Sequence, residues 1–442
     1  MLKTIFYNFN SHNFEKIPKI STDKDTNQIN PYIYFYSYKD PQGLGKKSCI
    51  TFFPYEGFAC IIDQDQKDKL TRTENSYENF NYPFAVDQSK YIRKLDKSQK
   101  KINSITLVIG NNCNLNCIYC YNKKQEEKAN KYNFKSFLKI IKKLCEKYNI
   151  KNIFFFSNGE PTLYWDKFQQ ILDNTKNFDI NYQLTTNGVI TNQQVLNDIL
   201  RYNFSILISI DGMINIHNFH RPLKKYRNSY NQMKKFIEWS VNNLDAKNKI
   251  FSRTTITKYN INDLIPTASH ISQLGINNQR YEKVWNSPEL EPNIEDFIHN
   301  IINLQLYADK SKINLSGSFF PSSSSIHNKI GCSSFLGENI VITENKKISL
   351  CLSPNKHTIW GEVKNKRFHI KLQYYSKKKD LEFKREILIK KCNSCPVQCI
   401  GPCMNPEVES KKESIVWCNV KLWILTQYLK TKFDNRLSES KK

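Results

Sequence analysis

The sequence of 442 residues lacks any run of about 18 or more apolar residues, so we expect no membrane-spanning helix and no membrane partner. Residues 1–8 turn polar quickly and lack the apolar stretch of a secretion signal, which predicts a cytoplasmic protein. Glycine is scarce, with 13 residues, whereas Lys, Asn, Ile and Tyr are abundant. The formal charge of +25 favours acidic partners, although a biased coding composition would produce it without any partner.

The 13 cysteines carry the most information about function. In a cytoplasmic chain we do not expect them to form a disulfide framework. Ten of them fall into two groups, and their short spacings indicate metal or iron–sulfur ligation. The groups are Cys113, Cys117 and Cys120, and then Cys332, Cys351, Cys392, Cys395, Cys399, Cys403 and Cys418.

Three segments differ in pattern and predict domains at 1–98, 99–315 and 316–442. The first holds aromatic and β-branched runs around 32–36 and 50–62, which predict a small β-rich unit. The third is rich in cysteine and has little regular apolar pattern. We therefore expect an irregular extension whose folding depends on bound clusters.

The middle segment alternates strand and helix patterns, which predicts an α/β fold with a parallel sheet. Six βα units are fewer than a closed barrel needs, so we expect a partial (β/α)6 TIM-like barrel. In such folds the reactive residues lie on loops at the carboxyl ends of the strands. The expected strands are 105–109, 153–156, 182–185, 206–210, 250–257 and 281–284, with helices that include 134–148 and 230–244.

The first cysteine group follows the first strand with the spacing Cys113-x3-Cys117-x2-Cys120. Three thiolates on one loop can hold three irons of a [4Fe–4S] cluster, which leaves the fourth iron open to the amino and carboxylate groups of S-adenosylmethionine (SAM). The alternative is zinc, which would need a fourth ligand from elsewhere in the chain.

This spacing, with Tyr119 just before the third cysteine, resembles the signature of the radical SAM superfamily. The resemblance implies that Tyr119 lies against the adenine. The sequence at 157–162, Ser-Asn-Gly-Glu-Pro-Thr, is similar to the Gly-Gly-Glu-Pro motif of that superfamily, with Asn158 in place of the first Gly. By this resemblance the methionyl ammonium of SAM would be received by Asn158, Gly159, Glu160 and Pro161.

Two further stretches, 186–188 and 209–212, match family patterns after the third and fourth strands. They imply that Asn187, Ser209 and Asp211 hydrogen-bond the ribose or the methionyl group of SAM.

The stretch 217–222 resembles the His-Asp-x-x-Arg-Pro sequence of peptide and protein maturases, with Asn218 in place of Asp. We expect Arg221 or Arg253 to bind the SAM carboxylate, with Arg221 favoured, and both histidines to be structural. No general base or hydrogen donor can be assigned from the sequence.

The second cysteine group resembles the SPASM extension, which carries two auxiliary [4Fe–4S] clusters. The resemblance implies that Cys392, Cys395, Cys399 and Cys418 hold the outer cluster, and that Cys332, Cys351 and Cys403 hold the inner one. The chain departs from the family in a shorter gap between Cys395 and Cys399, in Lys346 where the family has Gly, and in one cysteine fewer. The inner cluster would therefore have an open iron or another ligand. Zinc sites that include His357 are the alternative, and we expect Cys49, Cys60 and Cys145 to be buried as small apolar residues.

The SPASM resemblance implies a maturase for a ribosomally made precursor peptide. The reaction would be a crosslink, a thioether, an epimerisation or a backbone excision, and a flavodoxin or ferredoxin-type donor would supply the electron. Residues 1–98 could bind a leader segment as an added strand. The main alternative is an anaerobic sulfatase-type maturase. A radical SAM enzyme for RNA, suggested only by charge, and a non-catalytic metal scaffold are weaker alternatives, and we expect no nucleic-acid partner.

Overall fold

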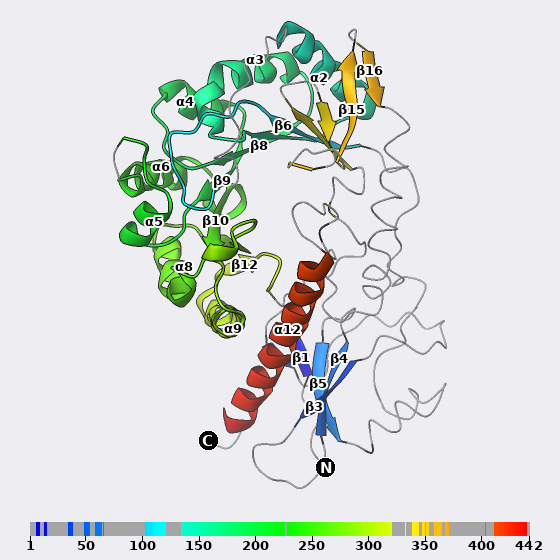
Figure 1. The fold of residues 1–442 in the computed structure, drawn as a ribbon, viewed down its shortest axis with the longest axis vertical. Helices are drawn as coiled ribbons and strands as arrows, with labels where there is room; N and C mark the ends of the chain where they lie inside the picture. The colour runs from blue at the N-terminus through cyan, green and yellow to red at the C-terminus, as the bar shows by residue number, and fades with distance from the viewer. Residues whose placement is uncertain are drawn as a thin grey trace.

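The computed structural model describes much of the chain in detail, including nearly all of 102–320. The described residues are 6–8, 13–15, 34–38, 48–53, 58–63, 65, 102–120, 134–225, 228–320, 332, 338–343, 347–349, 351–352, 358–364, 367–370, 403 and 411–439. Two β-sheets and a long C-terminal helix dominate this part of the chain (Figure 1).

The larger sheet has the strand order β12-β11-β10-β9-β8-β7-β6-β13-β14-β15-β16. From β12 to β13 neighbouring strands are parallel, and β14 to β16 extend the sheet in antiparallel fashion. The strands are β6 (Ser104–Val108), β7 (Asn152–Phe156), β8 (Asn181–Thr186), β9 (Ser205–Ser209), β10 (Ile250–Ile256), β11 (Asn278–Lys283), β12 (Asn314–Ser316), β13 (Asn339–Thr343), β14 (Lys347–Ser349), β15 (Ile359–Lys364) and β16 (Arg367–Ile370).

The six strands expected from the sequence form β6 to β11, which confirms a partial TIM-like barrel. Two parallel strands were not expected. Strand β12 extends one edge, and β13 pairs with β6 at the other, with Asn339 opposite Ser104. Because β13 comes from the segment 316–442, that segment contributes to the same sheet as the barrel.

Helices α2 to α9 cover one face of this curved sheet (Figure 1). Helix α2 shows why: Phe137, Ile141 and Leu144 are buried on one side, whereas Lys139 and Lys143 face solvent on the other. The helices are α2 (Phe134–Tyr148), α3 (Trp165–Thr175), α4 (Gln193–Arg201), α5 (Ile214–His220), α6 (Tyr230–Asn243), α7 (Ala246–Lys249), α8 (Leu264–Gln273) and α9 (Ile294–Ser311), with short 3-10 turns η3 (Pro161–Tyr164), η4 (Ile261–Asp263) and η5 (Pro288–Leu290).

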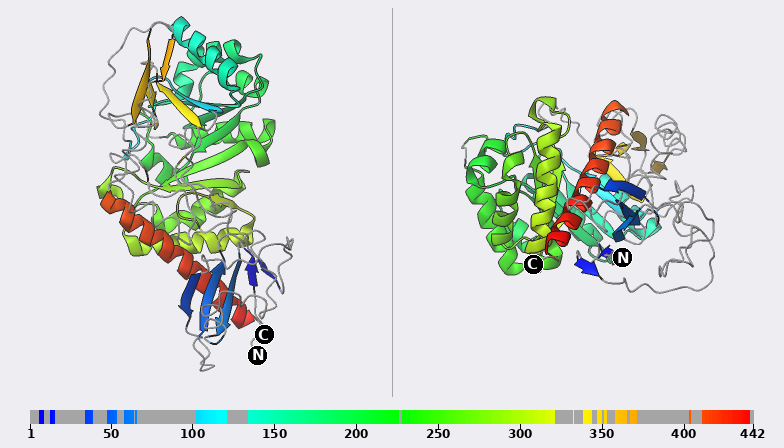
Figure 2. Two further views of the ribbon diagram at one scale, coloured as in Figure 1. Left: turned by 90° about the vertical axis from the view of Figure 1, so that its right-hand side faces the viewer. Right: turned by 90° about the horizontal axis from the view of Figure 1, so that it is seen from below.

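The smaller sheet is antiparallel, with the order β2-β1-β5-β4-β3. Its Ile50 and Ala59 belong to the same apolar cluster as residues of α9 and of the C-terminal helix. The views in Figure 2 show the sheet beside that helix. Its strands are β1 (Phe6–Asn8), β2 (Asn13–Glu15), β3 (Tyr34–Tyr38), β4 (Ser48–Phe53) and β5 (Phe58–Asp63).

The C-terminal segment contains more regular structure than expected, because α12 (Lys411–Glu439) is a helix of 29 residues. Its buried residues recur at helical spacing, so one face packs on the barrel. Trp417 packs edge-on against the rings of Phe297 and Phe319, and Tyr428 donates a hydrogen bond to Asp309 of α9 at 2.7 Å. None of the described helices combines the length and apolar character needed to cross a membrane.

Two of the three remaining cysteines behave as expected. Cys60 in β5 and Cys145 in α2 are buried among apolar side chains. Burial raises the pKa of the Cys145 thiol to about 11, which keeps it protonated.

Candidate functional site

A cavity of about 330 Å³ opens at the carboxyl ends of the parallel strands. Loops after β6, β7, β8 and β11 contribute to it, together with the ends of β9 and β10. Residues far apart in the sequence therefore meet at one place, as the strand order requires.

All three cysteines of the first group line this cavity. So do all the residues expected to contact SAM, except Asp211. The expected residues that line it are Tyr119, Asn158, Gly159, Glu160, Pro161, Asn187, Ser209, Arg221 and Arg253.

The cysteine loop (residues 109–120) is supported on one side by Tyr164 of η3. Gly110 has a φ of +76°, and a Cβ there would lie 2.0 Å from the Tyr164 ring, so only glycine fits. The Tyr164 hydroxyl accepts hydrogen bonds from the backbone N–H groups of Asn111 and Asn112 at 3.0 and 2.6 Å. This tyrosine therefore fixes the start of the loop.

The other side of the cysteine loop is held by residues 220–224. The Asn116 N–H donates to the Pro222 carbonyl at 2.8 Å, and the Ile118 N–H donates to the His220 carbonyl at 2.9 Å. The stretch that resembles the maturase sequence thus supports the cysteine loop through its main chain.

The three thiols of this loop are half-buried. Burial raises the pKa of Cys113, and it raises the pKa of Cys117 to about 12. Asn187 Nδ2 and the Leu115 N–H lie 3.8 and 3.4 Å from the Cys113 sulfur. Within the described residues, no three Cys, His, Asp or Glu side chains converge closely enough to share one metal ion.

Glu160 lines the cavity and is almost fully buried. It accepts hydrogen bonds from the Thr186 hydroxyl at 2.7 Å and from the Asn187 N–H at 2.8 Å, and also from the N–H and hydroxyl of Thr162. Burial nevertheless raises the pKa of Glu160. Its described hydrogen-bond partners include no cation, so an ammonium group that entered the cavity would stabilise its charge.

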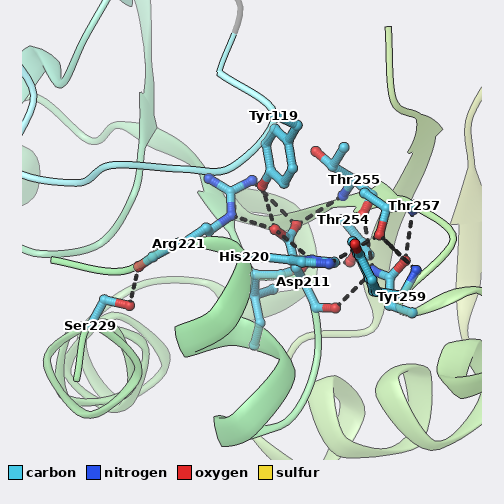
Figure 3. Close-up of polar contacts among 11 residues, drawn as sticks. Tyr119, Asp211, His220, Arg221, Ser229, Thr254, Thr255, Thr257 and Tyr259 are labelled. Atoms are coloured by element: carbon cyan, nitrogen blue, oxygen red, sulfur yellow. Dashed lines mark hydrogen bonds and ion pairs between the residues drawn. The ribbon is translucent and has the colours of Figure 1, made fainter. Parts of the chain in front are cut away.

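Of the residues expected to contact SAM, Asp211 is the one whose side chain does not line the cavity. It is fully buried and accepts hydrogen bonds from the Tyr119 hydroxyl and from Arg221 Nε, the latter at 2.8 Å (Figure 3). Burial opposes the charged form, but Arg221 and His220 hold the pKa of Asp211 well below its usual range.

The two arginines expected at the SAM carboxylate lie in different surroundings. Burial would lower the pKa of Arg221, but Asp211 outweighs it and raises that pKa above the usual range. Arg221 Nε and Nη2 both donate to Asp211, whereas Arg253 on β10 lines the cavity and is half-buried. Both arginines line the cavity, and Arg221 is held there by its ion pair with Asp211.

Both histidines of the maturase-like stretch are buried in the core. His217 packs edge-on against Tyr230, and burial lowers the pKa of His217 to about 3. His220 Nε2 lies 3.0 Å from the Thr257 hydroxyl. Neither histidine lines the cavity.

Several cavity residues carry no recognisable sequence signal. Glu282 and Lys283, the last two residues of β11, line the cavity together with Trp285 just after the strand. The Lys283 ammonium is buried, pairs with Glu291 and lies 4.3 Å from the Trp417 ring centroid. Glu282 and Lys283 lie within the sixth expected strand, 281–284, and Trp285 follows it directly, but no motif marked them as site residues.

The second cysteine group is described in part. Cys332 is exposed, and Cys351, Cys403 and Cys418 are half-buried. Leu352, next to Cys351, lines the cavity, which places Cys351 near it. The remaining members lie outside the described residues, and they are Cys392, Cys395 and Cys399.

Comparisons with known proteins place the cysteine loop within a match to a known family. Residues 107–271 match the family described as the Radical SAM superfamily. Curated relatives include the radical SAM cyclopropyl synthase TigE of Paramaledivibacter caminithermalis, which is 24% identical over 62% of this chain and 62% of that protein. Another is a cysteine-type anaerobic sulfatase-maturating enzyme of Clostridium novyi, which is 27% identical over 30% of this chain and 39% of that protein. The chain thus spans less than two thirds of the length of both relatives.

Among solved structures, anSMEcpe with bound AdoMet (SAM) superposes with a TM-score of 0.59 at 15% identity, over 75% of this chain and 100% of that chain. This likeness shows a shared fold. The family match begins in β6, just before the three cysteines, and includes β7 to β10, whereas β11 lies beyond its end. Residues 107–271, which include the cysteine loop, are therefore identified as a Radical SAM domain.

Proposed function

We propose that this protein is a radical SAM maturase that modifies a peptide or protein. The observation that carries the proposal is the convergence of three cysteines, a buried glutamate and an arginine on one cavity at the barrel mouth. SAM and a [4Fe–4S] cluster are the cofactors that this family implies, and the residues present fit both.

The thiols suit a cluster better than a single ion. Two sulfurs on one tetrahedral zinc lie about 3.8 Å apart, since each Zn–S bond is ~2.3 Å long. Among the described residues, no three Cys, His, Asp or Glu side chains are placed to share one ion. Cys113, Cys117 and Cys120 would instead each bind a separate iron of a cube.

The opposite cavity wall suits the amino-acid part of SAM. Glu160 would receive the ammonium group, because it is a buried carboxylate with a raised pKa. Arg253 would bind the carboxylate, and Tyr119, Asn187 and Ser209 would contact the nucleoside. When bound, cluster and SAM supply a 5′-deoxyadenosyl radical that abstracts hydrogen from an unactivated carbon.

A peptide substrate is supported by the kinds of relatives found. TigE is named a cyclopropyl synthase, and the sulfatase-maturating enzymes act on a protein by their name. Another solved structure holds anSMEcpe with bound AdoMet and a peptide named Cp18Cys, with a TM-score of 0.58. We infer a ribosomally made precursor peptide, with the smaller sheet as a candidate leader-binding unit. The second candidate is a sulfatase-type maturase, favoured by the same structural likeness.

Auxiliary clusters would extend the site. The position of Leu352 in the cavity wall supports an inner cluster near Cys351. Cys418, a proposed ligand of the outer cluster, lies in the first third of α12 next to Trp417. A reduced flavodoxin or ferredoxin would supply the electron. We retain the domain limits 1–98, 99–315 and 316–442 as a proposal, with β13 as the strand by which the third joins the second.

Coexpression with a candidate precursor peptide tests the function, with mass spectrometry as the readout. A loss of two hydrogens is expected for a crosslink, no mass change for an epimer, and a large loss for excision. Cys117→Ala should return an unmodified peptide that still binds with nearly unchanged affinity. Modification of the peptide by Cys117→Ala would reject the assignment of the cysteine loop.

A further inference from the structure

Asp211 is a buried carboxylate beneath the cavity that the proposed function does not use. It follows β9, its side chain is 0% exposed, and it is absent from the cavity wall. We propose that Asp211 is a positioning residue, which holds Tyr119 and Arg221 in place beside the cysteine loop and does not contact SAM itself. This inference rests on the proposed function, because it assigns a task within the same site.

The carboxylate joins three segments of the chain (Figure 3). Tyr119 donates its hydroxyl from the cysteine loop. Arg221 donates Nε and Nη2, at 2.8 and 3.3 Å, from the segment that backs the loop. The Thr255 N–H donates at 2.9 Å from the end of β10. Both oxygens are thus engaged by donors from three directions.

The backbone around Asp211 is fixed as well. Its carbonyl oxygen accepts from Asn260 Nδ2 at 3.1 Å, and Asn260 also donates to the Thr255 carbonyl at 3.0 Å. His220 Nδ1 lies 3.5 Å from the carboxylate, and its Nε2 meets the Thr257 hydroxyl. The carboxylate therefore cannot turn toward the cavity without breaking several of these contacts.

The partners of Asp211, in contrast, do reach the cavity. Tyr119 and Arg221 both line it, and the guanidinium carbon lies 5.4 Å from the Tyr119 ring centroid. Arg221 is 8% exposed, so loss of the Asp211 charge would leave a buried cation without its counter-ion. Arg221 would then move, and Tyr119 would lose the acceptor that orients its ring.

Asp211→Asn tests this task, with Asp198→Asn as the matched control. Asp198 is also a buried aspartate, but it binds Trp165 Nε1 and Gln194 Nε2 away from the cavity. Hydrogen exchange is measured on the metal-free proteins, and SAM affinity by equilibrium dialysis on the cluster-loaded proteins. Asp211→Asn should speed amide exchange in 114–120 at least about tenfold and weaken SAM binding at least about tenfold, with iron content unchanged. Asp198→Asn should match the wild type in both.

Tyr119→Phe keeps the test decisive if Asp211→Asn does not fold, because it removes only the hydroxyl that reaches Asp211. It should weaken SAM binding severalfold, at about three- to tenfold. Wild-type affinity in the variant that can be measured overturns the proposal. Weakened binding by Asp211→Asn with unchanged exchange also overturns it, since Asp211 would then act as a direct ligand. A wild-type protein that binds no SAM would reject the proposed function. Amide hydrogen exchange in the metal-free proteins would still test whether Asp211 holds the cysteine loop in place.

Discussion

The backbone of Gly159 packs directly on Asn112, so that a Cβ at position 159 would lie 2.0 Å from the Asn112 carbonyl oxygen. That carbonyl also accepts the Glu160 N–H at 2.9 Å. The contact joins the segment after β7 to the cysteine loop. The two motifs most typical of the family thus support each other through their main chains.

Gly159→Ala should therefore lower the occupancy of the first cluster. The new methyl group must push Asn112 away, and Cys113 with it, because the obstacle is backbone and not a flexible side chain. We expect iron bound per chain to fall by about one cluster after anaerobic reconstitution. Asn158→Ala removes a hydrogen bond to Asn111 at 3.0 Å without a clash, and should lose much less iron. Equal iron content in Gly159→Ala and wild type would contradict this packing argument.

Trp417 should be a main anchor of α12. It is 5% exposed, and Phe297, Phe319 and Lys283 surround its ring. Trp417→Ala should reduce the free energy of unfolding by about 3–5 kcal/mol. Trp423→Ala on the same helix is the control, because Trp423 is 56% exposed and should change stability by less than about 0.5 kcal/mol. Urea denaturation measures both, and similar losses for the two variants would show that α12 does not dock as described.

His217 should make the protein sensitive to acid. The pKa of His217 is about 3 in the folded state and near 6.5 in the unfolded state. Between these pH values the unfolded state binds a proton at His217 and the folded state does not, so acid favours unfolding. This contribution is absent above about pH 6.5 and grows as the pH falls, reaching about 2 kcal/mol of lost stability at pH 5. His217→Phe keeps an aromatic ring beside Tyr230 and should flatten the acid side of the stability profile. A profile with the wild-type slope between pH 5 and 6.5 would rule out a buried, neutral His217.

The strands of the barrel could be predicted because their apolar runs are local and regularly spaced. Strand β6, for example, is buried along its whole length. Strand β12 has only three residues, which is too short for a pattern. The pairing of β13 with β6 joins Asn339 to Ser104, and no local signal connects residues so far apart. The contact of α12 with α9, through Tyr428 and Asp309, also joins residues far apart in the sequence that no local signal connects.

The sequence could predict which residues meet at the site, because the motifs lie at the ends of successive parallel strands. Cys113, Glu160 and Asn187 follow successive strands, and the parallel sheet brings them together. The direction in which a side chain points could not be predicted in this way. Asp211 also follows its strand, yet its carboxylate pairs with the buried Arg221 and does not line the cavity. Tyr164, which holds the cysteine loop, lies in no family motif that the sequence displays.

Formation of 5′-deoxyadenosine is the most direct test of the central claim. The anaerobically reconstituted protein is reduced in the presence of SAM, and the nucleoside is quantified by chromatography. The wild type and Cys145→Ala, whose thiol is buried in α2, should both produce it, whereas Cys117→Ala should produce none. A cluster-loaded wild-type protein that releases no 5′-deoxyadenosine, or a Cys117→Ala variant as active as the wild type, would contradict the account.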